Sequence, residues 1–325
     1  MAQNRGLFPS FVGKSTKPVL ARSGSFSRAA VFASLLLLVG LSGNVGTMQR
    51  RRLYQDMATH VQRDGLKLLE VGEGGKHNRF FQFKHGRLTP VLKRLSIPVR
   101  AVVIPLPDLK VTRLLETALR HRLGGIVPGE LVWFQDTNIY HATIFHASSY
   151  EFPVVEDPGD VQKVQSVGST ICPLRVILEK IVVTSTGVII ACWQVAGGSE
   201  PATFRRSLKE VFEHAPSLKH QVIKSPWILH STIARLVGTP PAESNSEARS
   251  KISALGTREK KKPETQHLDP THIAHMADTL TSELCGLEMA IDNAWLVHEK
   301  DLLALALGGE YVKYDVPFLC KGAGR

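Results

Sequence analysis

The chain has 325 residues, enough for one large domain or two small ones, and its 43% apolar and 21% charged content is typical of a globular protein. Its net charge of +11 is concentrated in residues 1–52, which contain eight Lys/Arg residues and no acid. Subtracting these from the 40 basic residues leaves 32 against 29 acidic ones. The rest of the chain is nearly neutral, which argues against a large footprint on a nucleic-acid backbone.

The N-terminal region divides into a basic tail, residues 1–28, and an uncharged segment, residues 29–48, closed by Arg50, Arg51 and Arg52. Twenty helical residues rise about 30 Å, enough to cross a bilayer core. We interpret residues 29–48 as a transmembrane signal anchor of a single-pass membrane protein, most simply of the endomembrane system. A cleaved targeting peptide for a mitochondrion or chloroplast and a buried helix are the alternatives.

Residues 49–95 read as a juxtamembrane connector, and residues 96–320 as the folded domain. All the expected strands lie after residue 52, so we expect this body to fold without residues 1–52. A buried strand is predicted over residues 99–104, and a helix over residues 109–123, where apolar residues recur at helical spacing and Gly124 and Gly125 follow.

Two short strands share one pattern: histidine, any residue, threonine, apolar. The first contains His141 and Thr143, and the second, 89 residues later, contains His230 and Thr232. Side chains two apart in a strand share a face, so each strand presents an imidazole beside a hydroxyl. Imidazoles exchange protons near neutral pH, and hydroxyls donate to phosphoryl oxygens. The pair therefore indicates phosphate chemistry.

The segments around the two motifs alternate between strands and helices. Residues 174–183 and 188–195 read as a hairpin, residues 201–214 and 271–285 as amphipathic helices, and residues 288–307 and 311–318 as closing strands. Residues 239–269 are rich in Pro, Ser, Glu and Lys and read as a disordered insertion. The order predicts an α+β body whose two lobes of antiparallel sheet face each other across a central cleft.

The two motifs resemble those of the two-histidine (2H) phosphoesterase superfamily, which includes RNA ligase-like and cyclic nucleotide phosphodiesterase proteins. The resemblance covers roughly residues 95–318 and is to the plant-type, membrane-anchored branch. Six further segments resemble this branch: Phe145-His146-Ala147-Ser148, Cys172-Pro173-Leu174, Thr184-Ser185-Thr186-Gly187-Val188, Cys192-Trp193-Gln194-Val195, Ala234-Arg235-Leu236 and Leu302-Leu303-Ala304-Leu305-Ala306-Leu307.

The resemblance implies a phosphoric diester hydrolase that acts, without a metal or other cofactor, on a cyclic phosphodiester or an RNA end. His141 and His230 form the expected acid–base pair, and Thr143 and Thr232 the expected phosphate-binding hydroxyls. The expected partners are a nucleotide or RNA with a cyclic phosphate and the membrane, and the chain is expected to be a monomer. The sequence leaves open which histidine is the base and which phosphodiester is the substrate.

Period-two alternation places His146 and Arg235, each five residues after a motif histidine, on the opposite face from the catalytic pair. We therefore expect His146 to be a structural residue or one that supports the catalytic groups without touching the substrate, and Arg235 to pair with a carboxylate. Trp193 is a candidate for stacking on a nucleobase. The four cysteines show no metal or redox spacing, and no disulfide is expected between Cys172 and Cys192.

Two other functions are compatible with these patterns. The first is a catalytically silent 2H fold that binds a nucleotide or RNA end. The second is a membrane adaptor whose insertion, residues 239–269, recruits a partner. Intact His and Thr at all four motif positions favour the enzyme, because a binding protein needs no second group for proton transfer.

Overall fold

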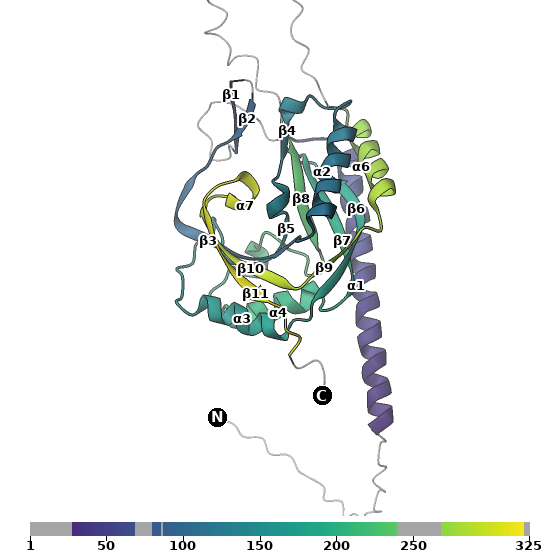
Figure 1. Cartoon of the computed structure of the whole chain (residues 1–325), viewed down its shortest axis with the longest axis vertical. Helices are drawn as coiled ribbons and strands as arrows, with labels where there is room; N and C mark the ends of the chain where they lie inside the picture. Colours follow the sequence, from purple (N-terminus) through teal and green to yellow (C-terminus); the bar gives the residue numbers. More distant parts are fainter. Residues whose placement is uncertain (1–27, 69–79, 86, 239–267, 322–325) are drawn as a thin grey trace, which may run out of the picture. The chain divides into compact units, whose positions relative to one another are not determined.

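A computed structural model describes residues 28–68, 80–85, 87–238 and 268–321, with side chains from residue 45 onward (Figure 1). The chain divides at residue 42, and all strands of the described residues belong to the unit that begins at residue 43. Every strand pairing is antiparallel. The predicted α+β class with antiparallel sheets is confirmed.

A four-stranded sheet carries the first histidine motif. Its order is β11 (Tyr311–Pro317), β10 (Asn293–Asp301), β3 (Arg94–Pro105) and β5 (His141–Ser148). The buried strand expected at residues 99–104 is the second half of β3, and the first motif strand, β5, lies beside it at the edge of the sheet.

A five-stranded sheet carries the second motif. Its order is β4 (Val132–Phe134), β8 (His230–Leu236), β7 (Val188–Gly197), β6 (Leu174–Val183) and β9 (Glu288–Ile291). The predicted hairpin is β6–β7, which turns at Gly187, where a positive φ of 79° favours glycine. A separate hairpin pairs β1 (Phe81–Lys84) with β2 (Arg87–Pro90).

Helices pack on these sheets as the hydrophobic patterns predict. Helix α2 (Leu109–Leu123) matches its predicted range, and Asp108 caps it by accepting from the backbone of Lys110 and Val111. Helix α6 (Pro270–Leu284) packs on β6, and α4 (Pro201–Val211) on β5. The remaining elements are α3 (Asp160–Thr170), which the sequence analysis missed, and the 3-10 turns η1 (Gly129–Leu131), η2 (Thr137–Ile139) and η3 (Leu218–His220).

The region predicted as closing strands, residues 288–307, contains a short helix as well. The chain leaves β10 at Asp301, passes through Leu303 in the left-handed conformation (φ 58°), and forms α7 (Ala304–Leu307). Leu305 packs on the four-stranded sheet beside Ala101 and Val103. Leu307 packs instead against Phe81 of the β1–β2 hairpin. Helix α7 thus curls over one face of the sheet (Figure 1).

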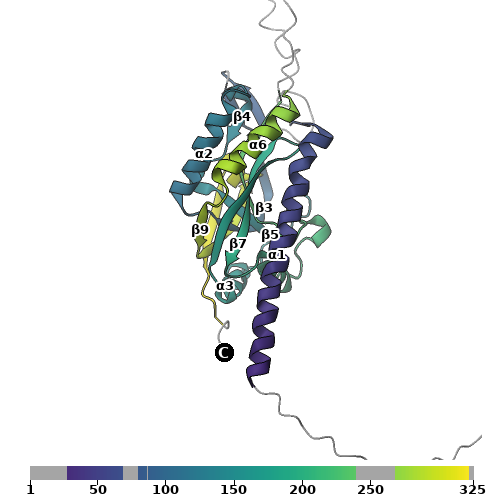
Figure 2. The same ribbon diagram turned by 90° about the vertical axis from the view of Figure 1, so that its right-hand side faces the viewer.

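Helix α1 (Arg28–Asp64) continues through the predicted boundary at residue 49, and its second half packs on the five-stranded sheet (Figure 2). The Tyr54 hydroxyl donates to the backbone oxygens of Trp193 (2.8 Å) and Leu229 (2.9 Å). The fully buried Arg50 side chain forms an ion pair with Glu200, with 2.5 Å between Nη1 and Oε2. The connector prediction was therefore wrong here, because this stretch is part of the body.

We expect a chain that lacks residues 1–44 to fold, whereas one that lacks residues 1–52 loses Arg50 and is much less stable. The single change Arg50→Met isolates the cause, because it leaves a mostly buried Glu200 carboxylate without its cation. The free energy of unfolding, measured by urea titration, should fall by about 3–5 kcal/mol. Arg51→Met is the control: its ion pair with Glu179 is exposed on the arginine side, and its loss should cost less than about 1 kcal/mol.

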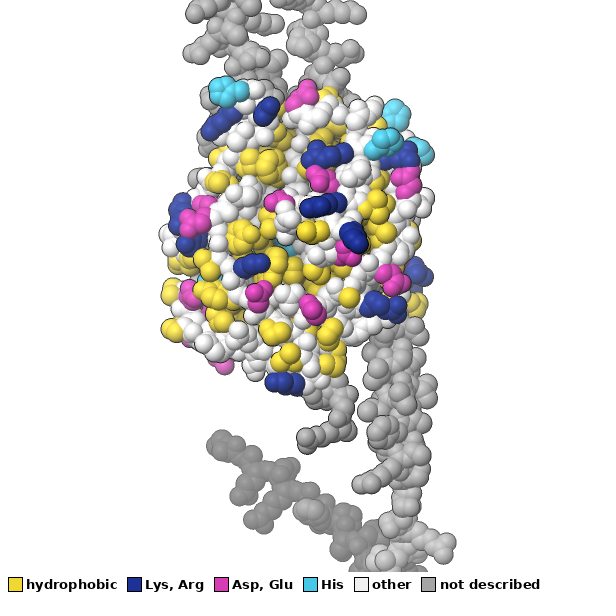
Figure 3. Space-filling model, viewed as in Figure 1, with side chains coloured by type: hydrophobic (Ala, Val, Ile, Leu, Met, Phe, Trp, Pro, Cys, Tyr) yellow, Lys and Arg dark blue, Asp and Glu magenta, His cyan; other side chains and the backbone are white. Residues whose placement is uncertain are grey.

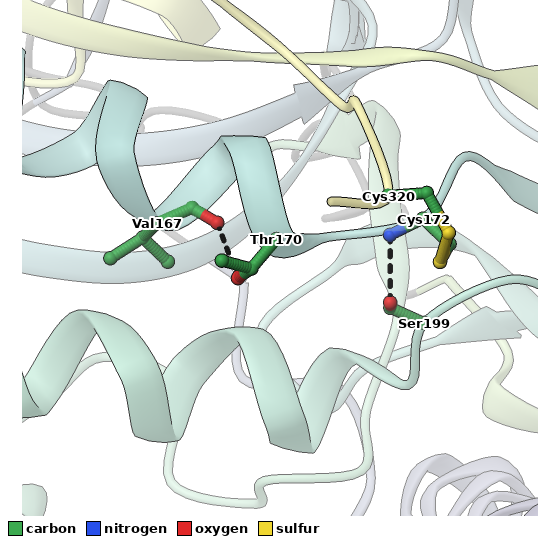
Figure 4. The surroundings of a disulfide bond; sticks show 5 residues. All are labelled: Val167, Thr170, Cys172, Ser199 and Cys320. Atoms are coloured by element: carbon green, nitrogen blue, oxygen red, sulfur yellow. Dashed lines mark hydrogen bonds between the residues drawn. A yellow bond between two sulfur atoms is a disulfide. The ribbon is translucent and has the colours of Figure 1, made fainter. Parts of the chain in front are cut away.

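A disulfide joins Cys172 to Cys320, 148 residues apart in sequence (Figure 4). It fastens the segment after β11 to the connection between α3 and β6. The backbone N–H of Cys172 donates to Ser199 Oγ (2.9 Å), and Cys320 N–H donates to the carbonyl of Ile171 (3.0 Å). Cys192 is free and buried, and Cys285 is free and exposed.

Within the residues that the structure describes, no helix carries an apolar stretch long enough to cross a membrane. Residues 1–27 of the predicted basic tail lie outside the described residues, as do the side chains of residues 28–44 and residues 239–267 of the predicted insertion. On the face of the body seen in Figure 3, Lys and Arg side chains are interspersed with Asp and Glu, as expected for a nearly neutral body.

Candidate active site

A cavity of about 530 Å³ lies between the two sheets and contains both histidine motifs. His141 and Thr143 line it from β5, and His230 and Thr232 from β8. The sequence thus placed these four residues in one site. The cavity also contains two polar residues expected to point elsewhere, His146 and Arg235.

A β-bulge explains why His146 faces the cavity. In the pairing of β3 with β5, Val102 lies opposite Phe145 while Val103 lies opposite Thr143, so Ile144 is an extra residue. One extra residue reverses the alternation that follows it. Ile144 and Phe145 are both buried, and His146 returns to the face of His141 and Thr143.

The second motif strand has the same irregularity at the equivalent position. In the pairing of β7 with β8, Ile189 lies opposite Ala234 while Ile190 lies opposite Thr232, so Ile233 is extra. Arg235 therefore faces the cavity with His230 and Thr232. Each strand presents three polar groups: His, Thr and His on β5, and His, Thr and Arg on β8.

The predictions for His146 and Arg235 were wrong for this reason, since strict alternation fails at a bulge. Arg235 forms no ion pair with any residue in the described part of the chain, and burial alone lowers the pKa of its guanidinium. The signal was present in the sequence: in both motifs, two consecutive apolar residues follow threonine and a polar residue comes next.

The bulge on β5 is held by two buried side chains. The Arg205 guanidinium, from α4, donates to the carbonyls of Ile144 (Nε, 2.9 Å) and Thr143 (Nη2, 3.3 Å). It also donates to the carbonyls of Pro226 (Nη1, 2.5 Å) and Ile228 (Nη2, 2.8 Å) on the segment that leads into β8. The Gln221 side chain makes two hydrogen bonds to the backbone of His146. Its Oε1 accepts from the His146 N–H, and its Nε2 donates to the His146 carbonyl, each at 2.9 Å. Arg205 therefore connects the two motif strands behind the cavity.

Burial makes all three imidazoles weak bases. Desolvation lowers the pKa of His146 to about 4, with a further contribution from His141. The pKa of His230 is lowered to about 4, mainly by desolvation and to a smaller extent by the charges of Arg205 and His141. Desolvation also lowers the pKa of His141, opposed by its hydrogen bond to Ile139. The lowered pKa values favour the neutral form of all three rings at pH 7, and a nearby anion would raise these pKa values.

The ring orientation of His141 is fixed by a backbone carbonyl. Its Nδ1 lies 2.8 Å from the oxygen of Ile139. A carbonyl oxygen only accepts hydrogen bonds, so Nδ1 carries the proton and Nε2 has the free lone pair. His141 is thereby arranged to accept a proton at Nε2.

Trp193 does not belong to the site. Its side chain is 1% exposed and packs in the main hydrophobic core on the other face of β7, so the predicted role in base stacking was wrong. The sequence analysis also missed several residues that line the cavity. Met57 contributes from α1, Thr184 and Thr186 from the β6–β7 turn, and Glu299 from β10. Nothing local in the sequence indicates these four, because they come from distant segments.

Glu299 is the buried carboxyl group of the cavity. Desolvation raises its pKa to about 7, opposed by a hydrogen bond from the backbone N–H of Leu305 (2.9 Å). The pKa of Glu299 is higher in the folded state than in the unfolded state. Protonated Glu299 therefore stabilises the folded state, and this contribution is fully present at pH values below the unfolded pKa. That contribution is lost as the pH rises through about 7.

We therefore expect Glu299→Gln to stabilise the protein at pH 8 but not at pH 5. The amide keeps the hydrogen bond from Leu305 and has no proton to lose. The difference in unfolding free energy between variant and wild type should grow by roughly 2–3 kcal/mol between the two pH values, measured by urea unfolding. A pH-independent difference would show that Glu299 does not titrate in this range.

Within the described ranges, no group of three or more His, Cys, Asp or Glu side chains is placed to hold a metal ion.

No protein-family model matches the sequence, and no curated protein matches it. Solved structures are similar in fold. The conserved protein of unknown function ATU0111 from Agrobacterium tumefaciens is 13% identical, with 69% of this chain and 87% of that chain covered and a TM-score of 0.41. The protein TT0787 of Thermus thermophilus is 13% identical, with 69% and 99% covered and a TM-score of 0.37.

A third similar structure is E. coli LigT complexed with 3′-AMP, at 8% identity, with 68% of this chain and 95% of that chain covered and a TM-score of 0.34. Identities and scores of this size leave the function to be inferred from the side chains of the cavity.

Proposed function

We propose that the protein is a metal-independent phosphodiesterase that opens a cyclic phosphodiester or hydrolyses an RNA end. The observation that carries this proposal is the convergence of His141, Thr143, His230 and Thr232 in one cavity, from equivalent bulged strands of two sheets. Two imidazoles and two hydroxyls around one space supply both proton-transfer groups and donors for a phosphoryl group.

In this mechanism His141 is the general base, because its Nδ1 proton is held by Ile139 and its Nε2 is free. It takes a proton from the attacking water. His230, protonated when the anionic phosphate raises its pKa, donates a proton to the leaving oxygen. Thr143 and Thr232 donate to the non-bridging oxygens, and the guanidinium of Arg235 stabilises the negative charge that develops there.

The test is hydrolysis of a panel in EDTA: 2′,3′-cyclic nucleotides, ADP-ribose cyclic phosphate and short RNAs with cyclic ends. Turnover of at least one compound is expected. Arg235→Gln should lower kcat/KM about 10–100-fold, as expected when a charged hydrogen bond to the transition state is removed. Arg206→Gln, an exposed arginine on α4, is the control for a lost charge.

Two results would contradict this function. Activity that disappears in EDTA and returns with zinc would replace the metal-free mechanism. Binding of a nucleotide without turnover of any panel member would favour the silent, ligand-binding alternative.

We further propose that residues 29–48 anchor the protein to a membrane of the endomembrane system and that the body acts as a monomer. The support is the run of twenty uncharged residues between a basic tail and three arginines. The full-length protein should stay in the pellet after carbonate extraction. A shortened, extractable mature form would instead indicate a cleaved targeting peptide of a mitochondrion or chloroplast.

A further inference from the structure

A second cavity of the body, an open groove of about 550 Å³, has no part in the mechanism above. It lies between β2 and the C-terminal end of α2, with β4 as its floor (Figure 1), and we call it the β2–α2 groove. Arg87 lines it from β2 and Arg120 from α2, while Trp133 and Phe134 line it from β4. Cations and aromatic rings in one groove are the groups with which proteins hold single-stranded nucleic acid.

The β2–α2 groove lies beside the active-site cavity. Trp133 pairs with Arg235 across β4 and β8, and residues directly opposite each other in such a pair project from the same face of the sheet. Arg235 lines the active-site cavity, and Trp133 lines the groove. The Trp133 indole N–H also donates to the carbonyl of Ala306 (3.1 Å), another residue of the active-site cavity. A ligand that extends out of the active-site cavity past Trp133 therefore reaches the groove.

The Arg120 guanidinium is held over an aromatic ring at the side of the groove. Its Cζ lies 3.7 Å from the centroid of the Phe134 ring, and its Nε and Nη2 donate to Glu116 Oε1 at 2.8 and 2.6 Å. The Arg120 side chain is still 54% exposed. Because Glu116 offsets the charge, Arg120 offers a ligand chiefly a fixed planar surface. Guanidinium planes of this kind stack on unpaired nucleobases.

Arg87 is the cation of the groove that remains for a phosphate. It is exposed, and it forms no ion pair with any residue in the described part of the chain. A carboxylate, Glu130, also lines the groove, so the surplus of positive charge there is small. The groove therefore suits one local phosphate contact and not a long electrostatic footprint, in agreement with the nearly neutral body.

We propose that the β2–α2 groove binds a nucleotide upstream of the reacting end of an RNA strand, with its base stacked on Arg120 and its phosphate paired with Arg87. This inference rests on the proposed phosphodiesterase function and narrows its substrate class. The preferred substrate is an oligoribonucleotide whose end enters the active-site cavity, in place of a free cyclic mononucleotide. An acidic peptide would match the charge of Arg87 but has no planar base for Arg120.

The test is a length series of uridine oligonucleotides that end in a 2′,3′-cyclic phosphate, from the mononucleotide to the pentamer, hydrolysed in EDTA. Along the series kcat/KM should rise by about 100-fold in total, with about tenfold from the stacked base and about tenfold from the phosphate contact. Arg120→Lys keeps the charge but removes the plane, and Arg87→Gln removes the charge. Each variant should lower kcat/KM of the pentamer about tenfold and leave that of the mononucleotide unchanged.

The salt dependence separates the two contacts. With increasing salt, log kcat/KM of the pentamer should fall more steeply than that of the mononucleotide. The difference in slope against log salt concentration should be about 0.7, the value for one phosphate of a single strand. Arg87→Gln should abolish this difference, whereas Arg120→Lys should keep it.

Gly129→Leu tests the space of the groove independently of charge. Gly129 lines the groove, and among the described residues a Cβ there would have no atom within 4 Å beyond its neighbours in the chain. The added side chain should therefore lower kcat/KM of the pentamer but not that of the mononucleotide, in protein of unchanged stability. Arg206→Gln, which removes an exposed charge of α4 that lines neither cavity, is the control and should change neither value.

Failure of this inference is separable from failure of the proposed function. If the mononucleotide and the pentamer are hydrolysed equally well, the phosphodiesterase function stands and the groove does not bind RNA. If no compound is hydrolysed, the phosphodiesterase function is wrong, and the fluorescence anisotropy of labelled pentauridine 3′-phosphate tests the groove by itself. Weaker binding to Gly129→Leu than to wild type would support an RNA site, and equal binding would overturn it. A poly-glutamate peptide that competes as well as unlabelled RNA would overturn it too.

Discussion

Replacing either His141 or His230 with alanine should lower kcat by about 10²–10⁴-fold, because each imidazole moves a proton in the transition state. The double variant should lose much less than the product of the two single losses. A base and an acid that act in one step are non-additive, since removing the first already disables the route that needs the second. Steady-state and single-turnover kinetics on a panel substrate would measure both effects.

The control for these variants is His298→Ala, a buried histidine outside the cavity, which should leave kcat unchanged in folded protein. Wild type should show a bell-shaped dependence of kcat on pH, and each single variant should lose one limb of it. Fully multiplicative losses in the double variant would mean that the two histidines act in separate steps.

Replacing Arg205 with methionine should cause the largest loss of stability among single substitutions near the site. Arg205 is 9% exposed, and its guanidinium donates to four carbonyls, two on β5 and two before β8. Methionine fills similar space but leaves these buried acceptors unpaired. We expect the free energy of unfolding to fall by about 3–5 kcal/mol, measured by urea titration.

Arg206→Met is the matched control, because Arg206 is the next residue on α4 and is exposed. Its effect should stay within about 0.5 kcal/mol. A folded Arg205→Met protein would also show a raised pKa for His230, since the charge of Arg205 helps to lower it. Equal stability of the two variants would show that water replaces the guanidinium without cost.

The sequence predicted the four motif residues of the site because each pair lies within two positions of one strand, where alternation is reliable. Alternation failed only beyond Ile144 and Ile233, where a single extra residue reverses the side-chain direction. His146 and Arg235 were misplaced by the same rule that placed His141 and His230 correctly. The paired bulges can be recognised in hindsight by two consecutive apolar residues in each strand.

Other errors came from contacts between distant segments. The packing of Arg50 and Tyr54 depends on groups 139 to 175 residues away, and no local pattern encodes those partners. The turn at Leu303 and helix α7 interrupt a run of leucine and alanine that is compatible with either strand or helix. Trp193 was wrongly taken as a candidate for base stacking, because its strand is apolar on both faces and the sequence does not show which face lines the cavity.

The cross-link between Cys172 and Cys320 has a practical consequence for anyone preparing this protein. Disulfides form in oxidising compartments and are rarely maintained in a bacterial cytosol. Material made there would arrive as free thiols, with Phe318 and the end of β11 retained only by packing and backbone hydrogen bonds. A native disulfide typically contributes about 2–4 kcal/mol, so such a preparation would be the less stable form. Expression into a periplasm or secretory pathway, followed by thiol counting, should therefore precede any conclusion drawn from an inactive sample.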